Sequence, residues 1–317
     1  MITTGVGVVV VNWNGLTDTL ACLESLVAAT PGPARVVAVD NGSTDSSVTA
    51  LRAWQAARPG HAGPAVTILE SSTNRGFSVA NNIGVEHLRA DPAISHFLLL
   101  NNDATVDPAF FREIARALAA APDAAIMGVT IYVAAPPPGP PRGEVWYAGG
   151  HFLLLRSLTE HERAVPRDAM PLPTEFVTGC AMLISRHAWE TLGPLPECYF
   201  IYFEDAEYSW RARAAGLPVL YAPRAVVHHA VSASVGRQPK PRVLQLHTRN
   251  RALFARRNFR GWTRWRALAY LVVSKSSRAM AEVLRGRLAL GWALFRGMIE
   301  GLMTSAGPHV DPATTSP

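Results

Sequence analysis

The sequence HFLLLNNDATVDPAFF, residues 96–111, carries the strongest signal for the architecture of the chain. An apolar run ends at Leu100 and is followed at once by Asn101, Asn102 and Asp103. A continuous apolar run is typical of a strand that is covered on both faces, as in a parallel sheet. The polar residues that follow fit an ordinary Asx turn. They also fit a binding site, because ligands of open α/β sheets bind at the carboxyl ends of the strands.

The residues before this stretch repeat the pattern of strand and helix. Strands are predicted within residues 6–14, 34–41, 65–72 and 95–103, and amphipathic helices within residues 17–29, 47–58 and 76–90. This alternation predicts a parallel, doubly wound sheet with right-handed crossovers. The Pro-rich residues 134–143 predict a surface loop, because a strand-like pattern resumes at 145–155.

Polar residues follow each of the four predicted strands. They are Asn12 and Asn14, then Asp40, Asn41 and Gly42, then Asn74, Arg75 and Gly76, and finally Asn101, Asn102 and Asp103. Because parallel strands end at the same edge of a sheet, we expect these side chains to line one crevice. Neither a G-x-G-x-x-G after the first strand nor a P-loop motif occurs in the sequence. A dinucleotide enzyme and a P-loop NTPase are therefore disfavoured.

A second cluster lies within residues 176–236. Glu204 and Asp205 follow an aromatic run at 199–203 and precede a helical pattern. They could be first-turn acids of that helix, or a pair whose apolar surroundings raise the pKa of a general base. His228 and His229 end a later strand, and with a sheet-edge aspartate they make a mixed Asp/His metal site plausible.

Composition restricts the class of protein. The chain has 317 residues, of which 49% are hydrophobic and 17% charged, as in a globular protein with a sizeable core. Its three scattered cysteines show no disulfide or metal pattern and suit a reducing cytoplasm. The first residues predict a strand and not a signal peptide. Residues 237–305 hold 15 Lys or Arg against two acids, which points to an anionic surface.

Seven motifs occur along the chain in this order: VVNWNG, VVAVDNGSTDSS, NRGFSVANNIG, FLLLNNDATVDP, FVTGCAMLISR, YFIYFEDAEYSWRARAAG and VVHHAVSAS. Together they resemble the family-2 inverting glycosyltransferases. The resemblance covers about residues 5–260 and is greatest to the bacterial rhamnosyltransferase-like branch. It implies the α/β GT-A fold, a Rossmann-like, mostly parallel sheet flanked by helices. It also implies a nucleotide-sugar donor and Mg²⁺ or Mn²⁺. We expect a catalytic domain at 1–236, with a nucleotide-binding half at about 1–108 and an acceptor half at 109–236. A basic helical extension at 237–305 and a disordered tail at 306–317 would follow.

The resemblance assigns roles to individual residues. Asp205 matches the catalytic base, with Glu204 next in line, and Asp103 matches the last acid of the Asp-x-Asp metal signature. His229 or His228 matches the further metal ligand. The residues that match positions binding the donor nucleotide are Asn12, Asn14, Asp40, Asn41, Gly42, Asn74, Arg75, Gly76, Asn81, Asn102 and Asp103. Those that match positions facing the acceptor are Gly179, Cys180, Tyr202 and Glu204.

Four positions depart from the family pattern. Asn101 and Asn102 stand where many relatives carry acids, which leaves Asp103 as the main carboxylate for the metal. Pro196 and Glu207 stand where the family usually has Asp. Weak or water-mediated metal binding is therefore one expectation.

The basic segment 237–305 allows two interpretations. It has no apolar run near the roughly 18 residues that span a bilayer. Trp265, Leu268, Val272, Ala279, Met280 and Val283 form a stripe at helical spacing, and residues 288–303 form a second apolar helix. The helices could pack on the catalytic domain. They could also lie on an anionic membrane, with Trp262, Trp265 and Trp292 at the interface.

We therefore expect an inverting, metal-dependent glycosyltransferase, with dTDP-rhamnose as the leading donor and a glycan or polyprenyl-diphosphate-linked acceptor. Its expected location is cytoplasmic, at the inner face of the plasma membrane, without a nucleic-acid partner; a homodimer is left open. The alternatives are a UDP-sugar-dependent transferase (GlcNAc, Gal or Glc) and a catalytically degenerate binding subunit at the membrane. A sugar-phosphate nucleotidyltransferase is disfavoured, because its Gly-rich basic loop after the first strand is absent.

Overall fold

The computed structural model describes residues 4–58, 63–134, 143–167, 169–230 and 240–305. The strands are β1 (Thr4–Asn12), β2 (Pro33–Asn41), β3 (Ala65–Ser71), β4 (His96–Asn101), β5 (Ala104–Val106), β6 (Ile126–Val133), β7 (Val145–Tyr147), β8 (Gly150–Leu153), β9 (Leu158–His161), β10 (Leu172–Pro173), β11 (Ala181–Ser185) and β12 (Val219–His229). The α-helices are α1 (Leu16–Ala28), α2 (Ser47–Ala56), α3 (Phe77–Arg89), α4 (Phe110–Ala120), α5 (Arg186–Leu192), α6 (Glu204–Ala214), α7 (Pro241–Asn258), α8 (Gly261–Leu284) and α9 (Leu288–Met303), and the 3-10 turns are η1 (Leu154–Arg156) and η2 (Glu197–Tyr199).

One mixed sheet forms the centre of the molecule, in the order β10-β12-β6-β11-β4-β1-β2-β3. The strands β3, β2, β1 and β4 are parallel, as the alternating sequence pattern predicts. Asn12 lies in register with Asp40, and Asn101 with Val11, so the polar residues after these strands meet at one edge. β11 is antiparallel to both of its neighbours, β4 and β6, and makes the sheet mixed.

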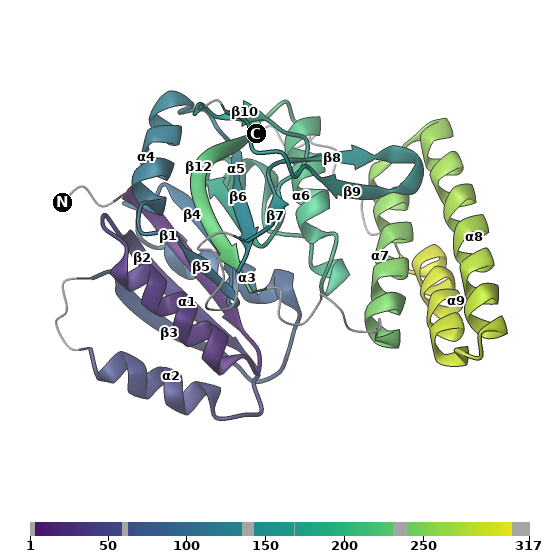
Figure 1. Cartoon of the computed structure of the whole chain (residues 1–317), viewed down its shortest axis with the longest axis horizontal. Helices are drawn as coiled ribbons and strands as arrows, with labels where there is room; N and C mark the ends of the chain where they lie inside the picture. The colour runs from purple at the N-terminus through teal and green to yellow at the C-terminus, as the bar shows by residue number, and fades with distance from the viewer. Residues whose placement is uncertain (1–3, 59–62, 135–142, 168, 231–239, 306–317) are drawn as a thin grey trace.

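Helices cover both faces of this sheet (Figure 1). Alternate residues of β1 serve opposite faces: Val8 and Val10 pack with Leu23 of α1, whereas Val9 packs with Val85 of α3. All of these side chains are buried. Burial on both faces explains why the strands read as continuous apolar runs. The expected α/β fold with a mostly parallel central part and a C-terminal helical extension is confirmed.

The helices α7, α8 and α9 lie together at one end of the molecule, beyond β8 and β9 (Figure 1). α7 belongs to the core of the preceding domain: the Phe254 ring stacks on Phe152 at 6.0 Å and meets Trp210 edge-on at 6.1 Å. α9 then packs on α7, since Leu294 lies against Leu244. The C-terminal helical extension therefore packs on the catalytic domain.

The predicted stripe of α8 divides between two environments. Leu268, Val272 and Ala279 pack inward against the core clusters. Trp265 and Met280 are 60% and 61% exposed. The apolar residues at helical spacing are thus partly packed and partly exposed, because only part of the stripe meets the neighbouring elements. Most of the predicted loop at 134–143 and the tail at 306–317 lie outside the described residues.

Candidate active site

The ends of β1 and β2 are joined by buried polar side chains. Asn12 Nδ2 donates to Asp40 Oδ2 at 2.7 Å and to Ser43 Oγ at 3.1 Å. Asp40 Oδ1 accepts from the backbone N–H of Ser43 at 2.9 Å. Each carboxylate oxygen of Asp40 thus accepts one hydrogen bond from the protein. Its remaining lone pairs can accept hydrogen bonds from a ligand.

The loop after β2 is held in a shape that requires glycine. Gly42 has φ +72°, and a Cβ there would lie 2.5 Å from the carbonyl carbon of Thr73. Asn14, with φ 51°, accepts through Oδ1 from the N–H of Thr44 at 2.8 Å. The two loops after β1 and β2 are therefore tied together as one wall at this edge of the sheet.

The loop after β3 is attached to the same wall. Asn41 Oδ1 accepts from the N–H of Arg75 at 3.1 Å, and Asn41 Nδ2 donates to Asn74 Oδ1 at 3.0 Å. Arg75 itself is exposed, and among the described residues no carboxylate pairs with its guanidinium. Arg75 is consequently available to an anionic ligand. Asn81 is buried and donates to the Phe77 carbonyl at 2.9 Å, within α3.

Gly76 connects this wall to the second sequence cluster. Its φ is +90°, and a Cβ would lie 2.4 Å from the carbonyl oxygen of Phe200. The N–H of Phe77 donates to that same oxygen at 2.6 Å. The two clusters, more than 100 residues apart in sequence, are therefore in direct contact.

Asp103 and His229 meet at the edge of the sheet. Asp103 Oδ1 lies 3.0 Å from His229 Nε2, and the Asp103 carbonyl accepts from the N–H of Ala230 at 2.8 Å. The antiparallel pairing of β5 with β12 brings them together, with His229 opposite Ala104. His228 points to the other face of the strand and stacks on Tyr132 at 6.1 Å. Of the two histidines, His229 is the one beside the aspartate.

The amides that precede Asp103 have structural partners. Asn102 Nδ2 donates to Thr19 Oγ1 at 3.0 Å, at the start of α1. The N–H of Asn101 donates to the carbonyl of Cys180 at 2.9 Å. These contacts fix the turn that carries Asp103.

The chemistry of this pair suits a divalent cation that is completed by other ligands. The described residues contain no cluster of three or more His, Cys, Asp or Glu placed to hold a metal ion. Asp103 and His229 offer one oxygen and one nitrogen ligand. His229 Nδ1 is buried without a hydrogen-bond partner. Two protein ligands fit a cation such as Mg²⁺, which takes its remaining ligands from phosphates and water.

Glu204 and Asp205 are the first two residues of α6, and Asp205 lies next to Gly179. Asp205 Oδ2 accepts from the N–H of Gly179 at 2.8 Å, and Asp205 Oδ1 accepts from the N–H of Ala206 at 2.8 Å. Burial raises the pKa of Asp205, and burial together with the charge of Asp205 raises the pKa of Glu204 well above its usual range. Glu204 Oε2 is buried without a hydrogen-bond partner, which fits a neutral carboxylic acid at neutral pH. Of the two carboxyl groups, Glu204 is therefore the one whose charged form is more strongly disfavoured.

The backbone before this pair is strained. Phe200, Tyr202 and Phe203 all have positive φ, of 67°, 71° and 79°. Asn250 of α7 holds them, since its Nδ2 lies 2.8–3.0 Å from the carbonyls of Tyr199, Ile201 and Tyr202. Strain that the surroundings enforce is typical of functional loops.

The residues predicted to face the acceptor are not equally accessible. Tyr202 is 37% exposed. Gly179 contacts Asp205 directly through its N–H. Cys180 is buried in the core, where burial raises the pKa of its thiol, so contact with an acceptor through its side chain does not fit.

Three residues of the site are absent from the sequence-based predictions. Asp18, in the first turn of α1, lies near Asp103, whose charge adds to burial in raising the pKa of Asp18. Asn250 and Arg257 support the catalytic loop from α7. Asp18 could have been found as an acid just after the first strand end, whereas nothing local marks the residues of α7.

The family model of glycosyl transferase family 2 matches residues 7–192, more than half of the chain. The chain belongs to glycosyl transferase family 2. A relative from Mycobacterium tuberculosis, named N-acetylglucosaminyl-diphospho-decaprenol L-rhamnosyltransferase, is 28% identical over 84% of this chain and 85% of its own. The low-salt glycan biosynthesis hexosyltransferase Agl10 of Haloferax volcanii is 24% identical over 67% of this chain and 62% of its own.

Solved structures share the fold of this family-2 chain. The mannosyltransferase PcManGT of Pyrobaculum calidifontis, in complex with GDP-Man and Mn²⁺, has a TM-score of 0.59 at 16% identity over 96% of this chain and 89% of its own. S. aureus TarS 1–349 with UDP-GlcNAc has a TM-score of 0.56 at 13% identity, over 94% and 81%. The GT-A fold expected from the motifs is thereby confirmed.

Proposed function

We propose that this family-2 glycosyltransferase moves L-rhamnose from a dTDP carrier to a lipid-linked glycan acceptor, with inversion at the anomeric carbon. The observation that carries the proposal is the match to the mycobacterial L-rhamnosyltransferase along 84% of this chain and 85% of the relative. The printed name of that relative specifies an acceptor linked to decaprenol through a diphosphate.

Asp205 is the base of the proposed reaction. The Gly179 N–H fixes the orientation of its carboxylate, and burial raises its pKa and hence its basicity. Because Glu204 is held neutral beside it, Asp205 can receive a proton without a second negative charge nearby. Asp205 would take the proton of the acceptor hydroxyl while that oxygen attacks the anomeric carbon of the donor.

The leaving diphosphate would lie at the opposite wall. Asp103 and His229 would hold a divalent cation, which when bound neutralises negative charge on the phosphates. Arg75, exposed and without a carboxylate partner in the described structure, adds a positive charge from the protein itself. Asn12, Asn14, Asp40 and Asn41 shape the pocket for the nucleoside.

We include in the proposal that the enzyme works at an anionic membrane surface. None of the helices in the described part of the chain is long and apolar enough to cross a bilayer. α8 and α9 nevertheless expose large apolar side chains to an extent unusual for a soluble surface: Trp262, Trp265, Val273, Met280, Leu284, Leu288, Trp292, Phe295, Ile299 and Met303. Arg264, Arg285 and Arg287 lie on the same two-helix unit, which suits anionic headgroups.

A panel of nucleotide sugars tests the donor. The purified protein is incubated with dTDP-rhamnose, UDP-GlcNAc, UDP-Gal, UDP-Glc or GDP-mannose, with a short polyprenyl-diphosphate-linked GlcNAc as acceptor and with Mg²⁺ or Mn²⁺. We expect transfer from dTDP-rhamnose at the highest kcat/KM. A preference for a UDP-sugar would replace the rhamnose assignment, and absence of transfer from every donor would favour a binding subunit.

A further inference from the structure

Three arginines, one lysine and one histidine lie where α7, α8 and η1 meet. We refer to this group as the cation cluster; its members are Arg156, His247, Arg251, Lys275 and Arg278. His247 and Arg251 are one turn apart on α7, and Lys275 and Arg278 are one turn apart on α8. The described residues of α7 and α8 include one acid, Glu282, and its carboxylate is bound to Arg287 at 2.7 Å.

The two innermost members have no anionic partner. Lys275 is 7% exposed, and the described structure gives its ammonium neither a hydrogen bond nor an ion pair. Arg251 is 5% exposed and has neutral partners: its Nε donates to the carbonyl of Arg156, and its guanidinium lies 5.8 Å from the centre of the Tyr270 ring. A cation that is largely removed from water and has no anionic partner destabilises the fold. Arg156 and Arg278 are exposed, so the cluster opens to solvent.

The members repel one another. Burial lowers the pKa of Lys275 to about 8, and the charges of Arg251 and Arg278 add to the shift. Burial lowers the pKa of His247 to about 4, with contributions from Lys275, Arg251 and Arg278. No carboxylate offsets these shifts. Concentrated like charge of this kind is typical of a functional site that is completed by a ligand.

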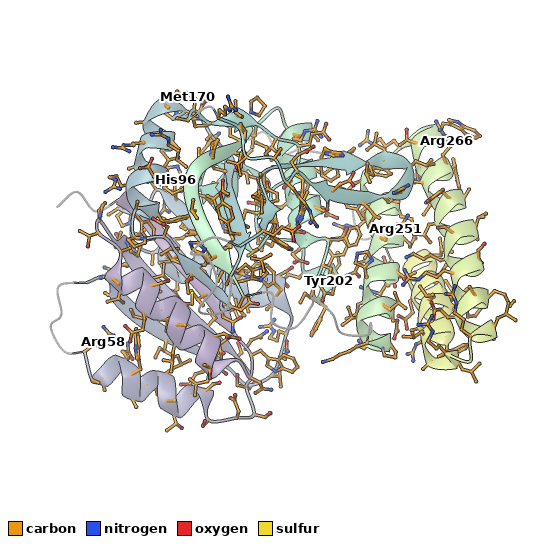
Figure 2. The ribbon with its side chains drawn as sticks, viewed as in Figure 1. Arg58, His96, Met170, Tyr202, Arg251 and Arg266 are labelled. Carbon is orange, nitrogen blue, oxygen red and sulfur yellow. The ribbon has the colours of Figure 1, made fainter. Side chains whose placement is uncertain are left out.

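The cluster adjoins the catalytic carboxylates. The His247 ring lies 6.2 Å from the ring of Tyr202 and 5.3 Å from that of Phe203, centre to centre. These two residues directly precede Glu204 and Asp205. Figure 2 shows Tyr202 and Arg251 at the junction of the catalytic domain with the C-terminal helices. A group bound here would lie on the side of the base and not in the donor loops around Asn12 and Asp40.

We propose that the cation cluster binds the diphosphate of a lipid-linked acceptor, and so presents the acceptor sugar to Asp205. This assignment rests on the proposed function. A diphosphate supplies the negative charge that Lys275 and Arg251 lack, and guanidinium groups bind phosphate oxygens through paired hydrogen bonds. The exposed apolar residues lie on α8 itself and on the adjacent α9, where the lipid chain would remain in the membrane. The donor diphosphate keeps its separate place near Asp103 and Arg75.

A binding experiment tests the site without requiring any sugar transfer. Wild type, Lys275→Met and the control Arg266→Met, which removes an exposed arginine of the same helix, are titrated at pH 7 with inorganic pyrophosphate and farnesyl diphosphate. EDTA is present throughout, which removes metal-assisted binding at Asp103. Affinity is measured from the shift in melting temperature. We expect Lys275→Met to lower the affinity at least about tenfold, the scale of one charge-assisted hydrogen bond, and Arg266→Met to match wild type.

The same melting curves separate a binding role from a structural one. Without ligand, Lys275→Met should melt at a higher temperature than wild type, because a buried unpaired charge is removed. A lower melting temperature, or unchanged affinity for both diphosphates, would overturn the proposal. Short-chain phosphatidylglycerol is the further titrant. If it binds as tightly as farnesyl diphosphate and is equally weakened in Lys275→Met, the site takes membrane headgroups, and the acceptor assignment is wrong.

A kinetic experiment then ties the site to the acceptor. The ratio of kcat/KM for a diphosphate-linked GlcNAc acceptor over a phosphate-free GlcNAc glycoside should fall about tenfold in Lys275→Met and stay unchanged in Arg266→Met. An unchanged ratio in Lys275→Met contradicts the proposal. Failure of transfer by wild type would concern the proposed function alone, since the binding experiment stands independently of it.

Discussion

Asp205 is the residue on which the proposed chemistry depends. Asp205→Asn retains the shape and the hydrogen bond from Gly179 but cannot accept a proton. We expect kcat to fall by a factor of roughly 100 or more, the scale of general-base catalysis, with little change in the Kd of the donor nucleotide. Steady-state kinetics and calorimetric titration of dTDP measure the two quantities. A kcat close to that of wild type would place the base elsewhere.

The raised pKa of Asp205 also predicts the pH dependence of catalysis. Burial shifts this pKa upward, so the basic form is lost at a higher pH than for an ordinary aspartate. The logarithm of kcat/KM should therefore decline as pH falls through the raised pKa. In the Asn variant this acidic limb should disappear from the residual activity. If kcat/KM of the variant still declines at acidic pH, the decline would report the titration of a different residue.

Asp103 and His229 are the residues expected to hold the cation. Asp103→Ala should weaken binding of dTDP and remove its dependence on added Mg²⁺ or Mn²⁺. His229→Ala should do so in part. His228→Ala is the matched control, because His228 stacks on Tyr132 on the other face of β12. Nucleotide binding is measured with and without EDTA, and a wild-type affinity that EDTA leaves unchanged would contradict the metal assignment.

At the scale of elements, the contact between α6 and α7 determines whether the catalytic loop keeps its shape. Glu207 is buried, accepts from the Tyr199 hydroxyl, and forms a paired hydrogen bond with Arg257 at 2.8 Å for each nitrogen. Hydrogen bonds from Arg257 are the main cause that lowers the pKa of Glu207 against the opposing effect of burial. The pair thus adds stability above the unfolded-state pKa of Glu207, and this stability is lost as pH falls through the lowered folded-state pKa.

Glu207→Gln should lower the free energy of unfolding by about 3–5 kcal/mol at pH 7, because Arg257 would remain as an uncompensated charge. Urea unfolding measures this. Glu70→Gln, which breaks the exposed pair with Arg52, is the control and should cost no more than about 1 kcal/mol. Equal losses in the two variants would show that α7 is not anchored through Glu207.

The elements that were predictable from sequence are those formed by local patterns. The strands β1 to β4 and their shared edge follow from apolar runs that end on Asn12, Asp40 and Asn101. The role of α7 was not predictable, because Asn250 and Arg257 act on a loop about 50 residues away in sequence. For the same reason the surroundings of the α8 stripe were not predictable: helical spacing places Trp265 and Leu268 on one side, but only packing against neighbouring elements decides which of the two is covered.

At the scale of the whole molecule, the exposed apolar face of α8 and α9 predicts binding to vesicles that contain anionic lipid. Binding should weaken with salt, since each basic residue at the surface contributes about 1 kcal/mol and the Debye length is roughly 3 Å at 1 M salt. Trp292→Ala with Phe295→Ala should reduce binding to all vesicles. Arg264→Gln with Arg285→Gln should reduce binding to anionic vesicles alone. Sedimentation with neutral and anionic vesicles measures both effects.

Trp13→Ala serves as the control for the vesicle experiment. Trp13 is 55% exposed but lies in the loop after β1, away from the C-terminal helices. Its removal should leave vesicle binding unchanged. If wild type binds neither kind of vesicle and instead forms dimers that the Trp292 and Phe295 substitutions dissociate, the apolar face is covered by a second copy of the chain.

The stereochemistry of transfer tests the central claim most directly. Product from dTDP-rhamnose and a GlcNAc-containing acceptor is analysed by NMR for the configuration of the newly formed glycosidic bond. With Asp205 as the single base and no covalent intermediate, the sugar in the product should have the anomeric configuration opposite to that in the donor. A product with the same configuration as the donor would contradict the account, because retention cannot arise from one direct displacement assisted by Asp205.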